Sequence, residues 1–288
     1  MALLPLLATA LLSAAAQAFP IAPPALNGFT DSFADPQRAG IKRATTEELL
    51  GMTSARCSGS LVEFNRKPEA KAVMITNGHC SRGSLLRPGE VIKDVPYVRP
   101  TAPISVGTRQ GFRRVTVSRV LYGTMTGTDM ALIELNQSYK ELTDLGAKVY
   151  GISDKDPAVG TLTRVVSGFW EERQDCTVVA HVKTLLEGEW TFTNSFAFDQ
   201  GCLIRGGYSG TPVVDPASDL VVAIVNTTNE RGVACAINNP CEVGDDGKKT
   251  AIPDRGYAQR VTDIPACVSA VGEIDFALSG CRLQKPSN

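Results

Sequence analysis

The stretch that decides the fold runs from Ile204 to Asp215 and reads IRGGYSGTPVVD. Its central residue, Ser209, stands between glycine-rich flanks and is followed by a proline and an apolar run typical of a β-strand. A serine among glycines is most often a turn residue, because glycine tolerates the backbone angles of a sharp bend. A sharp bend is also how a fold exposes a nucleophile. The two interpretations differ in whether the rest of the chain supplies the partners that serine chemistry needs.

Short β-type runs separated by Gly, Asn, Asp or Pro dominate the chain on both sides of this stretch. Examples are CSGSLVEF, AVMIT, MALIEL, CTVVAHVKTL and LVVAIVN. Many short strands at this spacing predict an all-β sandwich or barrel. One late segment differs. In TDIPACVSAVGEIDFAL, apolar residues recur at helical spacing after Asp263 as an N-cap and Pro265 in the first turn, which predicts a C-terminal helix.

Length and charge narrow the class of protein. The 288 residues suffice for a sizeable core, and a net charge of −1 indicates neither a nucleic-acid partner nor a polybasic membrane patch. Residues 1–18, MALLPLLATALLSAAAQA, are apolar and end in a small-x-small pattern, which predicts a signal peptide and secretion. A membrane anchor is the weaker alternative, because the apolar run is short and broken by a proline and alanines. We therefore expect no membrane association after signal removal.

The cysteines agree with export. There are eight, an even number, and none forms a C-x-x-C pair of the metal or redox type. Four disulfides are the natural interpretation in an oxidising compartment. The cysteines are Cys57, Cys80, Cys176, Cys202, Cys235, Cys241, Cys267 and Cys281.

The chain has two histidines, and their settings differ. His79 follows an apolar strand and an Asn-Gly turn in VMITNGHC, whereas His181 lies within a strand and is expected to be structural. Asp129 precedes the apolar strand MALIEL, where a turn aspartate is an equally good interpretation of that segment alone. A serine nucleophile needs a base to take its proton and a carboxylate to orient that base. The order His79, Asp129, Ser209 fits those roles.

Chain order also weighs against other serine hydrolases. The α/β-hydrolase elbow G-x-S-x-G fails here because Thr211 takes the place of the last glycine, and no histidine follows Ser209. A subtilisin-like order of Asp129, His181 and Ser209 is formally present. That arrangement would require a helical α/β framework, which the strand-rich pattern does not offer.

These motifs resemble those of the chymotrypsin-fold (trypsin-like) serine proteases, and especially the secreted microbial branch that includes the glutamyl-endopeptidase-like enzymes. The similarity is carried by SARCSGSLVEF, MITNGHC, TDMALIEL and GGYSGTPVVD. It implies two six-stranded antiparallel β-barrels, one in residues 51–150 and one in residues 151–288 together with the C-terminal helix. Residues 19–50 are then a propeptide or an N-terminal arm. His79 becomes the general base, Asp129 its orienting acid and Ser209 the nucleophile.

The same resemblance implies further features of the site. The N–H groups of Gly207 and Ser209 would form the oxyanion hole, where glycine leaves room for close backbone approach. Cys57 would pair with Cys80. The distance of Cys202 from the serine favours the pairs Cys176–Cys202, Cys235–Cys241 and Cys267–Cys281 over the connectivity of the animal enzymes.

Two departures from the family pattern limit its use. Tyr208 stands where trypsin-like members carry an aspartate that pairs with a freshly cut N-terminus, so a zymogen here would be activated by simple propeptide removal. The base of the specificity pocket aligns with Leu203, and Val225 stands where glutamyl enzymes carry a histidine. Neither a basic nor a glutamyl preference is therefore expected at the residue before the scissile bond. The expected pocket residues are Leu203, Thr227, Thr228 and Gly256.

The sequence thus predicts a secreted, monomeric serine endopeptidase that acts on proteins or peptides and needs no metal or cofactor. The segment Asp245-Asp246-Gly247 is interpreted as a turn, because the spaced ligands of a calcium loop are missing. The alternative is a catalytically silent protease homologue that serves as a secreted binding or adhesion module. Such a homologue usually lacks a member of the triad, whereas all three residues are present here.

Overall fold

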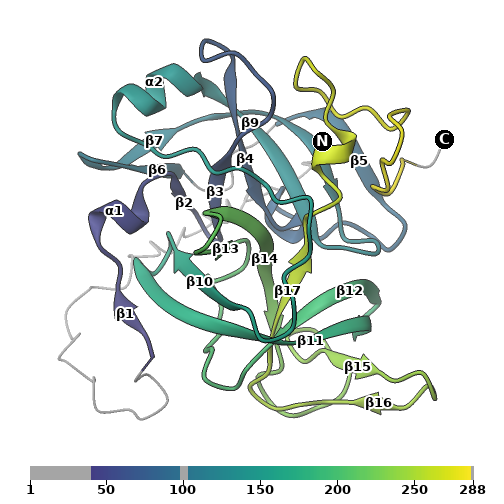
Figure 1. Ribbon diagram of the computed structural model, residues 1–288. Helices are drawn as coiled ribbons and strands as arrows, with labels where there is room; N and C mark the ends of the chain where they lie inside the picture. Colours follow the sequence, from purple (N-terminus) through teal and green to yellow (C-terminus); the bar gives the residue numbers. More distant parts are fainter. Residues whose placement is uncertain (1–39, 98–102, 287–288) are drawn as a thin grey trace, which may run out of the picture.

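The computed structural model describes residues 40–97 and 103–286, which form two antiparallel β-sheets with few helices (Figure 1). The all-β prediction is confirmed. The predicted signal peptide lies outside the described residues. None of the helices in the described ranges is long and apolar enough to cross a membrane. The helical elements of these ranges are α1 (Thr46–Leu49), η2 (Gly78–Cys80), α2 (Tyr139–Asp144) and η3 (Pro265–Cys267).

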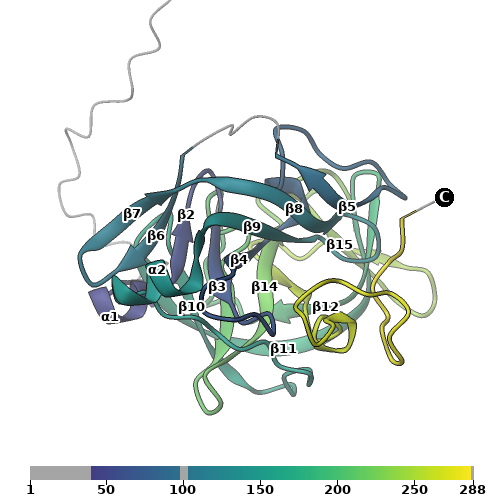
Figure 2. The same cartoon turned by 90° about the horizontal axis from the view of Figure 1, so that it is seen from above.

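The first sheet contains eight strands in the order β5-β8-β9-β4-β3-β2-β6-β7, and Figure 2 looks down on β5 to β9. Its central strands are apolar along almost their whole length, so they are buried on both faces. The count exceeds the six strands expected. The strands are β2 (Met52–Ser54), β3 (Ser58–Val62), β4 (Lys71–Thr76), β5 (Val91–Pro96), β6 (Ile104–Thr108), β7 (Gly111–Val115), β8 (Val117–Thr124) and β9 (Met130–Ser138).

The second sheet closes into a barrel. The order β10-β13-β14-β17-β12-β11 returns to its start because β11 also pairs with β10, which gives the six strands expected. β15 and β16 extend β11 beyond the barrel, and β1 from the predicted N-terminal arm pairs with the other end of β11. The strands are β1 (Lys42–Arg43), β10 (Leu162–Ser167), β11 (Glu172–Glu187), β12 (Trp190–Phe198), β13 (Pro212–Asp215), β14 (Leu220–Thr228), β15 (Cys241–Val243), β16 (Lys249–Thr250) and β17 (Gly256–Arg260).

The predicted C-terminal helix is wrong. After β17 the chain crosses back to the first sheet, and its described part there contains only the single 3-10 turn η3 (Figure 1). Gly272 adopts a φ of 75°, and a Cβ at this position would lie 2.3 Å from the Phe64 carbonyl oxygen. This left-handed residue turns the segment back on itself, so that Val271 is exposed while Ile274 packs into the core of the first sheet.

The structure contains four disulfides, in the pairs expected from the sequence. Three connect segments of one sheet or of the C-terminal tail, and the fourth holds the turn after β4 against the start of β3. The pairs are Cys57–Cys80, Cys176–Cys202, Cys235–Cys241 and Cys267–Cys281.

Candidate active site

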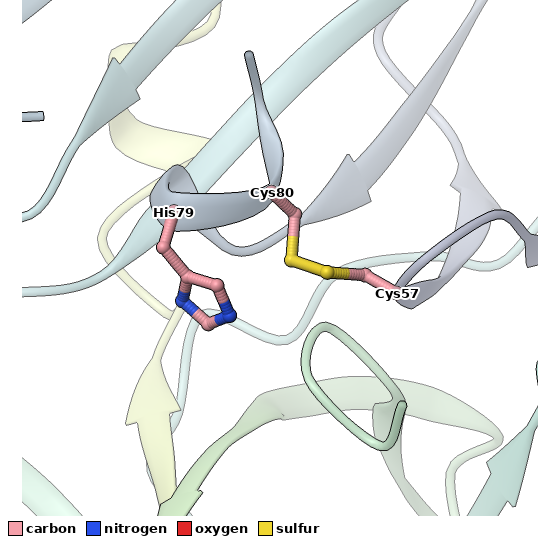
Figure 3. A group of neighbouring side chains, drawn as sticks. All are labelled: Cys57, His79 and Cys80. Atoms are coloured by element: carbon pink, nitrogen blue, oxygen red, sulfur yellow. A yellow bond between two sulfur atoms is a disulfide. The ribbon is translucent and has the colours of Figure 1, made fainter. Parts of the chain in front are cut away.

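The turn that carries His79 is held from two sides. It follows β4 as η2, and the Asn77 side-chain amide donates a 2.8 Å hydrogen bond to the Asp129 carbonyl oxygen. A Cβ at Gly78 would lie 2.1 Å from the Thr124 carbonyl oxygen, so only glycine fits there. The disulfide Cys57–Cys80 lies beside the imidazole and ties the turn to β3 (Figure 3).

The same group of side chains does not offer a thiolate metal site. Cys57, His79 and Cys80 bring their ligand atoms within 4.8 Å of one another. The two sulfurs are bonded to each other, as Figure 3 shows, whereas a metal-binding cysteine coordinates as a free thiolate. The neighbouring disulfide therefore acts on His79 by fixing its backbone.

Asp129 contacts His79 with both carboxylate oxygens. Oδ1 accepts a hydrogen bond from the His79 backbone N–H at 3.0 Å, and Oδ2 lies 2.6 Å from Nδ1 of the ring. Asp129 is 1% exposed, so its carboxylate is shielded from water, whereas the His79 side chain is 24% exposed. Burial lowers the pKa of His79, but the charge and hydrogen bond of Asp129, with a smaller contribution from Glu187, outweigh it and raise the pKa above 6.5. With Nδ1 engaged, Nε2 is the ring nitrogen left for proton transfer.

Ser209 lies in the turn between β12 and β13, and glycines make that turn possible. Gly207 has a φ of 92°, and a Cβ there would meet the Phe169 ring at 2.5 Å. Gly210 has a φ of 79°, and a Cβ there would lie 2.3 Å from the Ser58 carbonyl oxygen. A side chain at either position would combine backbone strain with a clash. Gly207 and Gly210 of the opening motif are therefore required by the geometry around Ser209.

His79, Asp129 and Ser209 line one cavity of about 90 Å³. The Ser209 hydroxyl donates to the Asn226 carbonyl oxygen at 3.4 Å, and it makes no hydrogen bond to His79 in this structure. A rotation about the serine Cα–Cβ bond would redirect the hydroxyl. Catalytic hydrogen bonds in unliganded enzymes are often long or poorly aligned and tighten when substrate binds. A larger cavity, of about 360 Å³, lies on the disulfide side of His79 and is also lined by Arg56 and Arg82.

The peptide before Gly207 is oriented by an indole. Trp170 Nε1 donates a 2.9 Å hydrogen bond to the Gly206 carbonyl oxygen. Since this peptide is trans, the N–H of Gly207 points away from the indole. Within the described residues, neither this N–H nor that of Ser209 donates to another acceptor. Both donors are thus free for a substrate oxygen.

Tyr208 occupies a buried site with its own network. The ring is fully buried, and its hydroxyl donates to Glu172 Oε2 at 2.9 Å. The same oxygen accepts a 2.6 Å hydrogen bond from Arg205, whose guanidinium lies 4.3 Å from the Trp170 ring centroid. Burial raises the pKa of Tyr208, and the neighbouring Glu172 carboxylate raises it further. The turn is therefore stabilised by a side-chain cluster in the place where trypsin-like enzymes use a salt bridge to the N-terminus.

The expected specificity residues are not together at the cavity. Thr227 lines it, but Leu203, Thr228 and Gly256 do not line either cavity at His79. Thr228 and Gly256 are cross-strand partners in β14 and β17. A Cβ on Gly256 would lie 2.5 Å from Ile204 Cγ1, so the Ile204 side chain occupies the space beside this glycine.

His181 is a structural residue, as expected. Its Nε2 lies 2.7 Å from the Pro157 carbonyl oxygen, and its ring packs edge-on against Phe196 at 5.0 Å. Asp129 contacts His79 instead, so the subtilisin-like combination does not form.

Sequence reasoning missed Glu187, which lies at the end of β11 and lines the cavity with His79 and Ser209. Its only signal in the sequence is its place at the end of β11, where Leu185 and Glu187, two residues apart, are both buried. An acidic residue in an inward-facing series is unusual and could have been noticed. Trp170, in the turn before β11, and Glu172, the first residue of β11, lie far from Ser209 in sequence and were missed as well.

Comparison with known proteins yields structural matches only. No protein-family model matches the chain, and no curated protein matches it in sequence. Among solved structures, the MamO protease domain of Magnetospirillum magneticum aligns with 77% of this chain and 97% of its own, at 16% identity and a TM-score of 0.49. Human heparin binding protein aligns with 77% of this chain and 91% of its own, at 14% identity and a TM-score of 0.47.

A third structure, the VesB protease of Vibrio cholerae, aligns with 77% of this chain and 64% of its own, at 12% identity and a TM-score of 0.44. At such identities and TM-scores the similarity carries no information on activity or substrate. What this chain can do is therefore argued from its own side chains.

Proposed function

We propose that the protein is a serine endopeptidase of the chymotrypsin-like type, secreted and active as a monomer on protein or peptide substrates. The observation that carries the proposal is the contact between Asp129 and His79 in a cavity that Ser209 also lines. A buried carboxylate that fixes a histidine tautomer beside a serine in a glycine turn is the arrangement that hydroxyl nucleophiles require. Secretion is supported by the signal-like residues 1–18 and by the four disulfides.

The mechanism follows from the roles that the geometry suits. Ser209 Oγ attacks the peptide carbonyl carbon while His79 Nε2 takes the hydroxyl proton. The oxyanion that forms is stabilised by the N–H groups of Gly207 and Ser209, each worth about 3 kcal/mol in comparable sites. The imidazolium then gives its proton to the leaving amine, and an acyl-enzyme remains. Water, activated by His79, hydrolyses this ester and restores Ser209.

Activation by propeptide removal fits the cluster around Tyr208. In this proposal no new N-terminal amine has to reach the turn, because Glu172 and Arg205 already hold it. The placement in the secreted microbial branch of the family rests on the sequence motifs. Mass spectrometry of the secreted protein locates the mature N-terminus and so tests the removal of the signal peptide and of the propeptide.

Covalent labelling with a fluorophosphonate probe tests the proposed function. The processed protein is expected to be labelled at Ser209, and Ser209→Ala is expected to abolish labelling and peptide hydrolysis. Ser218→Ala is the matched control, because this serine is exposed on the turn between β13 and β14 and should be without effect. Absence of labelling in folded, processed protein would favour the alternative, a catalytically silent homologue that acts as a binding or adhesion module.

A further inference from the structure

Glu187 is a buried carboxylate that forms no salt bridge with any described residue. It is 8% exposed, and its Oε1 accepts hydrogen bonds from the Thr227 hydroxyl at 2.9 Å and from the Asn238 N–H at 2.7 Å. Its Oε2 accepts no hydrogen bond from any described residue. Buried carboxylates are almost always paired, because an unpaired charge away from water is costly. One oxygen of Glu187 is therefore left for a donor from outside the chain.

The surroundings of Glu187 define what that donor would be. The cavity that contains it also holds the active serine and histidine, and its other walls are mostly apolar. A lysine or arginine side chain matches such a site, since its aliphatic stem buries against apolar walls while its charged end reaches the carboxylate. Aromatic walls add attraction for a cation. The apolar wall residues are Leu85, Met125, Trp190, Phe192 and Ile237.

The charges in the cavity favour a cation over an anionic group. Burial raises the pKa of Glu187, hydrogen bonds from Asn238 and Thr227 lower it, and the nearby Asp129 charge raises it again. Two carboxylates thus face one small cavity, with His79 the only basic side chain that lines it. A bound ammonium or guanidinium would stabilise both, whereas a substrate carboxylate would be repelled.

We propose that Glu187 is the specificity-determining residue of a subsite for a lysine or arginine side chain of the peptide substrate. This inference rests on the proposed function. Because Ser209 lines the same cavity, and an extended chain advances by about 3.3 Å per residue, the basic residue lies within three positions of the scissile bond.

The test compares lysine and arginine with norleucine, which has the lysine stem without its charge. Fluorogenic peptides carry one of the three at each of the three positions on either side of the scissile bond, and kcat/KM is measured. At one position we expect a preference for the basic residue of about tenfold to a hundredfold, the range of a charge-assisted hydrogen bond to a buried carboxylate. Glu187→Gln should reduce this preference to less than threefold.

Glu189→Gln is the matched control, because it removes the same charge from an exposed residue two positions along the hairpin. It should keep the full preference. Equal cleavage of lysine and norleucine peptides at every position by the wild-type protein would overturn the proposal, and so would a preference that survives in Glu187→Gln. The wild-type comparison decides the matter even if that variant does not fold.

A binding measurement separates this inference from the proposed function. In Ser209→Ala, fluorescence anisotropy of the best lysine peptide and its norleucine counterpart reports the subsite without hydrolysis. If the protein is neither labelled nor active but still binds the lysine peptide at least tenfold more tightly, the proteolytic function is wrong and the cationic site stands. If the protein is active and shows no difference in cleavage or binding, the proteolytic function stands and the cationic subsite is wrong.

Discussion

The turn that carries His79 and the turn that carries Ser209 are held in different ways. The first is tied covalently to the start of β3 by Cys57–Cys80, and its imidazole is hydrogen-bonded to Asp129, which directly precedes β9 of the same sheet. The second depends on glycines with positive φ and on a cluster of side chains from a separate loop. A covalent tie is insensitive to the loss of any one hydrogen bond, whereas a side-chain cluster can be loosened by removing one group. The geometry of the serine should therefore be the more easily disturbed of the two.

The largest effect is expected from a change in the proposed triad itself, and not from a change in the contacts that hold either turn in place. Asp129→Asn keeps an oxygen for the His79 N–H but places an amide beside Nδ1, which favours the wrong imidazole tautomer. We expect kcat/KM to fall by about 10³–10⁴-fold, with little change in the thermal midpoint. Steady-state kinetics and thermal unfolding measure both.

The control for this change is Asp245→Asn, which removes the same charge from a side chain that is 85% exposed. Its activity should match that of the wild type. A kcat/KM of Asp129→Asn within tenfold of the wild-type value would mean that His79 does not depend on this carboxylate. The proposed triad would then be wrong.

A smaller effect is expected when one hydrogen bond that holds the Ser209 turn is removed. Tyr208→Phe removes only the hydroxyl that donates to Glu172 and should cost about 1 kcal/mol of stability, or about 2–4 °C in Tm. Because the residue adjoins Ser209, kcat should also fall severalfold. Thermal unfolding and steady-state kinetics are measured on the same preparation.

Tyr139→Phe provides the matched comparison in the first sheet. Its buried hydroxyl donates to the Val62 carbonyl at 2.7 Å and accepts from the Val73 N–H at 3.1 Å. Stability should fall at least as much as in Tyr208→Phe, but kcat should be retained. An equal loss of kcat in both variants would show that general destabilisation, and not the Ser209 turn, controls activity.

The sequence predicted the parts of the site that are encoded locally. Each residue of the proposed triad lies in a short motif that ends or begins a strand, and the chain order His79, Asp129, Ser209 together with the family resemblance selected them. Glu187 escaped because its partners come from elsewhere, 40 and 51 residues along the chain, and no local pattern reports that convergence. The false helix had the opposite cause: its apolar spacing was real, but Gly272 adopts a left-handed conformation that periodicity does not reveal.

The smallest expected effect concerns the pH dependence of the His79 turn. The acid limb of kcat/KM reports the pKa of the free histidine, and the protonated imidazole cannot accept the serine proton. Since the pKa of His79 is raised, activity should fall as the pH drops through a value above 6.5. The charged groups that line the two cavities at this ring are Asp129 and Glu187 in one, and Arg56 and Arg82 in the other. Glu187→Gln removes one of the two charges that raise the pKa of His79, so the limb should move to lower pH. Profiles are measured with the norleucine peptide, so that loss of a substrate contact does not enter. An acid limb at or below pH 6.5 in the wild type would contradict this prediction, and so would a limb that moves to higher pH in Glu187→Gln. Either result would show that burial, and not the charges of the two carboxylates, has the larger effect on the pKa of His79.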